Sequence, residues 1–194
     1  GNEHFRYYRL ANAEAITLSG QVSIRWIENK MNGYLNKLLN TDKEDYVIAS
    51  DTDSIYLNLG PLVSKFFANK SSDKAAVVSI LDKICQEKLE PFIERSYEEL
   101  ASYVSAYDQK MSMKRENIAD RGIWTAKKRY ILNVWDSEGV RYKEPKMKIM
   151  GLETARSSTP AYFRDKLYAA FQIIIGKSND AVSYTHLTLP TSHC

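Results

Sequence analysis

The sequence predicts an α+β fold in which antiparallel β-hairpins pack on long helices. Apolar residues recur at steps of three and four over residues 11–39, a spacing typical of one long amphipathic helix. Two short runs of β-favouring residues, 46–49 and 55–57, flank a small polar centre and indicate a hairpin. Helical and β-type patterns then alternate along the 194 residues without an internal repeat.

The rest of the chain continues this mixture of patterns. A helix is expected around residues 62–67, and another over residues 74–89, with an interruption at Pro91. Residues 107–135 alternate and are rich in Tyr, Trp, Ile and Val, which predicts a second antiparallel ribbon. After it we expect a turn at 136–139, a loop over 143–160 and a last helix over 161–175.

The final residues, from Val182 to Cys194, read VSYTHLTLPTSHC and continue neither the helical nor the strand pattern. The string resembles the translation of a sequencing adapter. Residues 182–194 are therefore expected to be a non-native tail and are left out of the predicted fold.

The composition is that of an ordinary folded protein, with 44% apolar and 11% aromatic residues. No run of about 18 apolar residues occurs, so neither a transmembrane helix nor a membrane partner is expected. The first residues are aromatic and charged, unlike a secretory leader. The two cysteines, Cys85 and Cys194, form neither a metal pattern nor a disulfide framework, which predicts a reduced, cytoplasmic setting.

Charge is distributed unevenly, although the net charge is only +3. Residues 73–99 carry four basic and seven acidic side chains, whereas residues 110–166 carry fourteen basic and seven acidic ones. The basic segment is typical of a face that binds a polyanion, and an ordinary solvated surface is the alternative.

The sharpest local feature is the string Asp51-Thr52-Asp53-Ser54 between two apolar strands. Carboxylates at i and i+2 of a hairpin turn face the same water, and a cation is needed to offset their repulsion. Mg²⁺ suits such a pair because it is a hard ion bound through one or two carboxylates plus substrate phosphates. The alternative is a turn that uses Asp only because Asp favours turns.

Four motifs, in the same order, resemble the family B DNA polymerases. YVIASDTDSIY (46–56) is similar to the palm motif of that family, with Ala49-Ser50 where some members carry Tyr-Gly. KKRY (127–130) resembles the later motif that packs on the primer–template duplex. GNEHFRYY, at the start, resembles the sequence that follows the fingers-helix motif. KIMGLETARSSTP (148–160) resembles the palm-to-thumb connection of replicative polymerases of T-even-like phages, so the likeness covers essentially residues 1–175.

The resemblance implies a role for each matching residue. Asp53 would be the second of two metal-binding palm aspartates and would bridge both Mg²⁺ ions. Asp51, also a candidate catalytic and metal-binding carboxylate, would lie beside them and tune the site more than hold the metal, and Glu116 is a looser match to a carboxylate near the metals. Lys128 and Tyr130 would contact the primer strand near its 3′ end. The implied DNA-binding residues are Lys127, Lys128, Arg129, Tyr130, Lys148 and Gly151.

The resemblance also implies a division of the chain and a reaction. Residues 1–150 would be the C-terminal part of a palm domain, and residues 151–181 the palm-to-thumb junction and the start of a thumb. The reaction would be template-directed transfer of a dNTP to a primer 3′-hydroxyl, with primer–template DNA as partner and a sliding clamp as a further partner of the full-length protein. The other palm aspartate, the fingers and the exonuclease carboxylates would lie outside the chain, so the fragment alone is expected to be inactive.

Two other classes of protein remain open at this stage. One is a non-enzymatic, basic α+β module that binds nucleic acid and uses its acidic turn only structurally. The other is a different palm enzyme, such as a reverse transcriptase or an RNA polymerase. KKRY following a DTDS hairpin favours family B over the latter, because the resemblance covers both motifs. Binding of Mg²⁺ that depends on Asp53 would separate the enzyme from the binding module.

Overall fold

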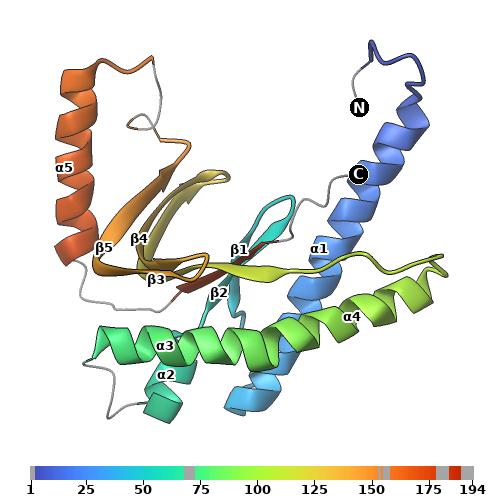
Figure 1. Ribbon diagram of the computed structural model, residues 1–194, viewed down its shortest axis with the longest axis horizontal. Helices are drawn as coiled ribbons and strands as arrows, with labels where there is room; N and C mark the ends of the chain where they lie inside the picture. The colour runs from blue at the N-terminus through green and yellow to red at the C-terminus, as the bar shows by residue number, and fades with distance from the viewer. Residues whose placement is uncertain (1–2, 68–72, 153, 155–157, 178–183, 189–194) are drawn as a thin grey trace.

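A six-stranded antiparallel sheet with helices along it makes up the part of the chain that the computed structural model describes, namely residues 3–67, 73–152, 154, 158–177 and 184–188 (Figure 1). The helices are α1 (Leu10–Leu39), α2 (Gly60–Phe67), α3 (Lys74–Ile84), α4 (Glu90–Tyr103) and α5 (Ala161–Lys177), with the π-helical turn η2 (Cys85–Leu89) between α3 and α4. The strands are β1 (Val47–Ser50), β2 (Ser54–Asn58), β3 (Lys114–Ala126), β4 (Arg129–Ser137), β5 (Val140–Met150) and β6 (Tyr184–Thr188). The predicted α+β class is thus confirmed.

The strands lie in the order β1-β2-β6-β3-β4-β5. Hairpins join β1 to β2, β3 to β4 and β4 to β5, whereas β6 comes from the far end of the sequence. In Figure 1, α3 and α4 run along one side of the sheet, α1 crosses near β1, and α5 stands beside β5. Within the hydrogen-bonded sheet, β6 therefore lies between the two hairpin systems and pairs with both.

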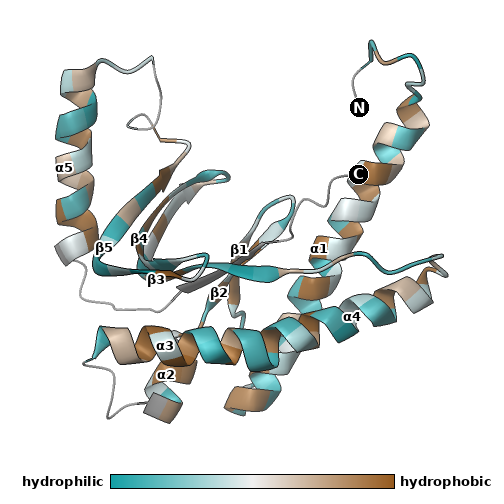
Figure 2. Ribbon diagram, viewed as in Figure 1, coloured by the Kyte–Doolittle hydropathy of each residue, from teal (hydrophilic) through white to brown (hydrophobic). Residues whose placement is uncertain are grey.

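Helix α1 begins and ends where the apolar periodicity predicted, within one residue. Its last turn closes on Asn40, which adopts a left-handed conformation (φ 56°) and donates its backbone N–H to Asn36 and Lys37 carbonyls. One face of α1 is buried from Ser23 to Leu39, whereas apolar residues of its first half, such as Ile16 and Leu18, are exposed. Figure 2 shows the alternation of apolar and polar residues along the helix. Asn32 Oδ1 accepts the backbone N–H groups of Tyr46 and Val47 at 2.9 and 3.0 Å, so α1 also anchors the start of the edge strand β1.

The main core lies between the helices and one face of the sheet. Strand β2 shows the alternation clearly, because Ile55 and Leu57 enter this core while Tyr56 faces the other side. Helices α1 to α4 supply most of the remaining residues. The members that are fully shielded from solvent are Ile27, Met31, Leu35, Ile55, Leu57, Leu59, Cys85, Leu89 and Ile93.

The predicted interruption at Pro91 takes a different form in the structure. The helix does not stop at Pro91, which occupies the first turn of α4; it widens before the proline into the π-helical turn η2. The N–H of Glu90 there donates to the carbonyl of Cys85, five residues back. Proline has no N–H to donate and its ring crowds the preceding turn, and a π turn is one of the distortions that lets a helix continue past such a strain.

The prediction of a loop over residues 143–160 was wrong for residues 143–150. Residues up to Met150 form β5, which pairs with β4 from Ser137↔Val140 to Tyr130↔Met150. β5 is an edge strand, and its register shifts between Val134 and Asp136, in the stretch of the ladder that contains Pro145. An edge or a bulge is where a sheet tolerates proline, and that is why Pro145 suggested a loop from sequence alone.

The expectation that the end of the chain continues no strand pattern was also wrong within residues 184–188. These residues form β6, which pairs with β2 from Ser54↔Thr188 to Asn58↔Tyr184 and with β3 on its other side. Strands pair through backbone hydrogen bonds, which do not require alternating apolar and polar side chains. A segment without such alternation can therefore still pair with a strand on each side. The origin predicted for residues 182–194 stays a prediction, and the rest of that tail lies outside the described residues.

Helix α5 packs on the far end of the sheet. Ile175 of α5, Ile131 of β4 and Leu152 form a small buried cluster. Arg121 of β3 donates from Nη1 to the carbonyls of Ile175 and Gly176, at 2.7 Å each, and so satisfies carbonyls at the last turn of α5. None of the helices in the described part of the chain is long and apolar enough to cross a membrane.

Candidate functional site

The acidic turn between β1 and β2 is the first part of the site. Asp51 and Asp53 lie where predicted, at the tip of the hairpin, and both side chains are partly exposed. The backbone N–H of Asp51 donates to the carbonyl of Ser54 at 2.9 Å and closes the turn. Asp51 Oδ1 accepts the N–H of Thr52 at 2.8 Å, a local contact that is one reason why Asp favours turns. Asp53, by contrast, makes no hydrogen bond or ion pair with any residue that the structure describes.

The KKRY turn comes from the other hairpin system and reaches the same place. Lys127 and Lys128 connect β3 to β4, and Lys128 Nζ lies 3.7 Å from Asp51 Oδ1. The Lys128 side chain is 63% exposed, so its ammonium stays available to a second anion. Two of the sequence-predicted site residues, from different motifs, are thus brought together by the tertiary fold.

Three aromatic rings form the floor between these two motifs. The ring of Tyr56 contacts Trp124 and Tyr130 edge to face, with centroids 5.4 Å apart in both pairs. Burial is the main cause that raises the pKa of Tyr56 well above its usual range, and interactions with Tyr130 raise it further. Burial therefore favours the neutral form of the Tyr56 hydroxyl, and the three rings pack together as one cluster.

Glu116 and Lys148 lie across the same face of the sheet. Glu116 Oε1 is 2.5 Å from Lys148 Nζ, and the two side chains are 21% and 32% exposed, respectively. Glu116 also contributes to the raised pKa of Tyr56, which places the carboxylate near the aromatic floor. We call the set Asp51, Asp53, Glu116, Lys128 and Lys148, with the three rings beneath it, the site face.

The carboxylates of the turn fit part of a magnesium site. Asp and Glu oxygens are the hard ligands that Mg²⁺ prefers, and the two turn carboxylates are open to solvent. Among the described residues, however, no three His, Cys, Asp or Glu side chains come together as a metal-binding group. The metal roles of Asp51, Asp53 and Glu116 therefore stay predictions, and Glu116 pairs with Lys148.

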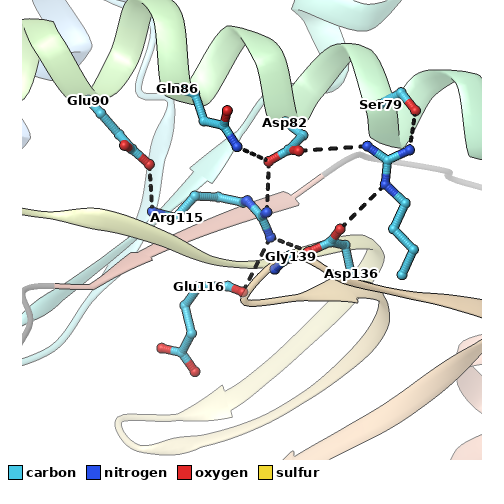
Figure 3. Close-up of polar contacts among 9 residues, drawn as sticks. Ser79, Asp82, Gln86, Glu90, Arg115, Glu116, Asp136 and Gly139 are labelled. Carbon is cyan, nitrogen blue, oxygen red and sulfur yellow. Dashed lines mark hydrogen bonds and ion pairs between the residues drawn. The ribbon is translucent and has the colours of Figure 1, made fainter.

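A buried ion network fixes the strand that carries Glu116. The side chain of the preceding residue, Arg115, is 4% exposed; it contacts Asp136 of β4 and donates to Asp82 of α3 at 2.7 Å (Figure 3). Burial alone would lower the pKa of the Arg115 guanidinium, but its contacts with Asp136 and Asp82 together raise it, so the group stays charged. Figure 3 shows the Glu116 carboxylate pointing away from this network, toward the opposite side of the strand.

The predicted DNA-binding residues differ in how they are presented. Lys127 and Lys128 are exposed, Arg129 and Lys148 are partly exposed, and Gly151 lies directly under the KKRY turn. Tyr130 is only 7% exposed because its ring belongs to the aromatic floor. The direct DNA contact predicted for Tyr130 stays a prediction, and the geometry adds a packing role.

Several residues of the site have no signature in the sequence. Tyr56, Trp124 and the Arg115 network were not singled out from the sequence, and the structure packs Trp124 against a buried cluster. The one available signal was Arg115, a charged residue next to alternating apolar positions. Its partners, Asp82 and Asp136, lie in different elements and could not be read from spacing.

No family model matches the chain. The chain is 48% identical over 168 residues to the DNA-directed DNA polymerase of Escherichia phage RB69, covering 82% of this chain and 19% of that protein. It is 40% identical over 190 residues to the DNA-directed DNA polymerase of Enterobacteria phage T4, covering 94% of this chain and 21% of that protein. The chain thus spans about a fifth of the length of these relatives.

Proposed function

We propose that this chain, a homologue over most of its length of the DNA-directed DNA polymerases of T4-like phages, forms the part of a family B polymerase palm that carries the DTDS turn and the KKRY turn. The observation that carries the proposal is the approach of these two turns, with Lys128 Nζ 3.7 Å from Asp51 Oδ1. A copying enzyme needs its catalytic carboxylates next to groups that hold the primer terminus. The site face supplies both kinds of group within one surface.

Asp53 is the stronger candidate for the metal ligand. Asp51 is already engaged by the N–H of Thr52 and by Lys128, whereas no described residue engages Asp53. Mg²⁺ bound here would supply activation of the primer 3′-hydroxyl and stabilisation of the leaving pyrophosphate. The chain's own residues would orient the primer: Lys128 binds its phosphate backbone, and the aromatic floor holds the turn that carries Lys128.

The basic side chains around the turn suit contact with DNA backbone of any sequence. Lys127 and Lys128 project from the turn, and Lys148 lies on the neighbouring strand β5. Lysine is a point charge that contacts phosphate without reading a base, as a template-directed enzyme requires. Primer–template DNA and dNTPs are the proposed substrates of the whole protein, a sliding clamp is a further proposed partner, and the host cytoplasm is its proposed place of action.

The proposed division keeps residues 1–150 in the palm and residues 151–181 at the junction with a thumb. β5 ends at Met150, and Ile175 of α5 packs with Leu152 and with Ile131 of the sheet. The alternative function, a binding module with a structural turn, gains support only from the local contacts of Asp51. The carboxylate of Asp53, which no described residue engages, favours the enzyme.

Single-turnover nucleotide incorporation by the complete polymerase tests the proposal. Asp53→Ala should abolish incorporation, because it removes a ligand proposed to serve both metals. Asp51→Ala should reduce incorporation less, because Asp51 lies beside the metals and also pairs with Lys128. Equal, small losses in the two variants would contradict the assignment and favour the binding module.

A further inference from the structure

The turn that presents Lys128 holds an unfavourable backbone conformation. Lys128 has a φ of 62°, in the left-handed region that disfavours residues with a side chain. It is the second residue of a two-residue connection, since Ala126 and Arg129 are the last paired residues of β3 and β4. Turns with a positive φ at this position usually carry Gly or Asn there. Contacts from outside the turn would help to hold Lys128 in this conformation.

Gly151 provides that support from the end of β5. The ladder between β4 and β5 ends at Tyr130↔Met150, so the next residue lies beside the turn. A Cβ placed on Gly151 would come within 2.1 Å of the Lys128 carbonyl oxygen and 3.2 Å of Arg129 Cγ. Two backbone segments are packed together here at a distance that no other residue permits, and Gly151 itself has a φ of 67°.

We propose that Gly151 is a positioning residue for Lys128. Its lack of a side chain lets the backbone after β5 support the carbonyl of Lys128, which holds the strained turn and keeps the ammonium beside Asp51. Gly151 would then affect DNA binding indirectly, through the backbone of Lys128. The inference deepens the proposed function and rests on the assignment of Lys128 to the DNA backbone.

The chain offers a matched control for the glycine. Gly139, in the turn between β4 and β5, also has a positive φ (86°), but a Cβ there would meet nothing within 4 Å. Gly139→Ala and Gly151→Ala therefore impose the same kind of backbone strain. Only Gly151→Ala also drives an atom into the Lys128 carbonyl.

The experiment measures binding of a fluorescent primer–template duplex to the 194-residue chain between 50 and 200 mM NaCl. Lys128→Ala should lower the salt slope by about one unit, which reduces the loss of affinity over this range by about three- to fourfold. Gly151→Ala should lower the slope by a similar amount, the double variant should match Lys128→Ala alone, and Gly139→Ala should keep the parent slope. Non-additivity is expected because both substitutions remove one contact.

The outcomes separate the inference from the proposed function. An unchanged slope in Lys128→Ala overturns the DNA contact of Lys128, and with it the inference. A lowered slope in Lys128→Ala with a parent-like slope in Gly151→Ala, or with additive effects in the double variant, overturns the inference alone. If Gly151→Ala unfolds at too low a temperature for the binding measurement, adding Lys128→Gly to this variant should raise its melting temperature, because glycine at position 128 lets the turn move away from the new side chain. No such rescue would also overturn the inference.

Discussion

Arg115 of β3 donates from Nη2 to Asp82 Oδ1 of α3 at 2.7 Å, and this buried contact ties the helix layer to the strand that carries Glu116. The same guanidinium contacts Asp136, whose side chain has no exposed surface. Two carboxylates from different elements thus surround one positive charge. Burying these charges costs desolvation free energy, but the contacts fix the position of β3 relative to α3.

Arg115→Leu should lower the free energy of unfolding by about 3–5 kcal/mol, because it removes the buried cation beside Asp136 and leaves only the half-exposed Arg141 near that carboxylate. Arg141→Ala is the matched control: this arginine approaches the same two carboxylates at 3.6 and 3.7 Å, yet its side chain is 49% exposed. Arg141→Ala should lower the free energy of unfolding by less than about 1 kcal/mol. Urea unfolding of the two variants measures the difference, and equal losses would contradict a dominant role for Arg115.

Tyr97→Phe should leave stability unchanged or raise it by up to about 1 kcal/mol at neutral pH. Tyr97 is 1% exposed, and its hydroxyl has no hydrogen-bond partner among the described residues, so the substitution removes an unsatisfied buried group. Urea unfolding at neutral pH measures this effect. A loss above about 1 kcal/mol would reveal a partner for the hydroxyl.

Tyr97 should also make stability depend on alkaline pH. Burial raises the pKa of Tyr97, so the folded state keeps a proton that the unfolded state releases above its ordinary pKa of about 10. Stability from this group is therefore complete below that pH and is lost as the pH rises above it. Between pH 9 and about 11, the free energy of unfolding should fall more steeply with pH for the parent than for Tyr97→Phe. Parallel pH profiles would count against the raised pKa.

Arg121→Ala should loosen α5 from the sheet. Arg121 Nη1 donates to the Ile175 and Gly176 carbonyls at 2.7 Å, and its charge lies at the negative end of the α5 dipole. The free energy of unfolding should fall by about 2 kcal/mol. Amide hydrogen exchange should become faster by a larger factor along α5 than along α3. Arg164→Ala is the control, because that arginine lies on the same helix and no described residue bonds its side chain. Similar exchange in both variants would argue against the cap.

The 194-residue chain should show no templated primer extension. In-line transfer needs metals held from two sides, and the described residues place no third acidic side chain with Asp51 and Asp53. Positioning of the incoming nucleotide would also be incomplete. A primer-extension assay with Asp53→Ala as background measures this. Extension above that background would mean that the chain holds a complete site.

The sequence by itself determined the elements whose signals are local. The period of α1, the hairpin with Asp51 and Asp53 at its tip, and α5 all follow from apolar spacing and turn chemistry within one segment. The acidic turn and the basic KKRY string were recognisable for the same reason. Each is a short run of residues whose chemistry depends on its immediate neighbours.

Only the tertiary structure decided which of these segments meet. The approach of Lys128 to Asp51, the pairing of Glu116 with Lys148 and the burial of Arg115 join residues from separate elements, and no spacing rule predicts such partners. β5 and β6 were missed because a ladder is formed by backbone groups of another strand, which can hold a proline-containing or non-periodic segment. Local sequence sets the shape of each piece, whereas long-range packing sets the surface on which the pieces act together.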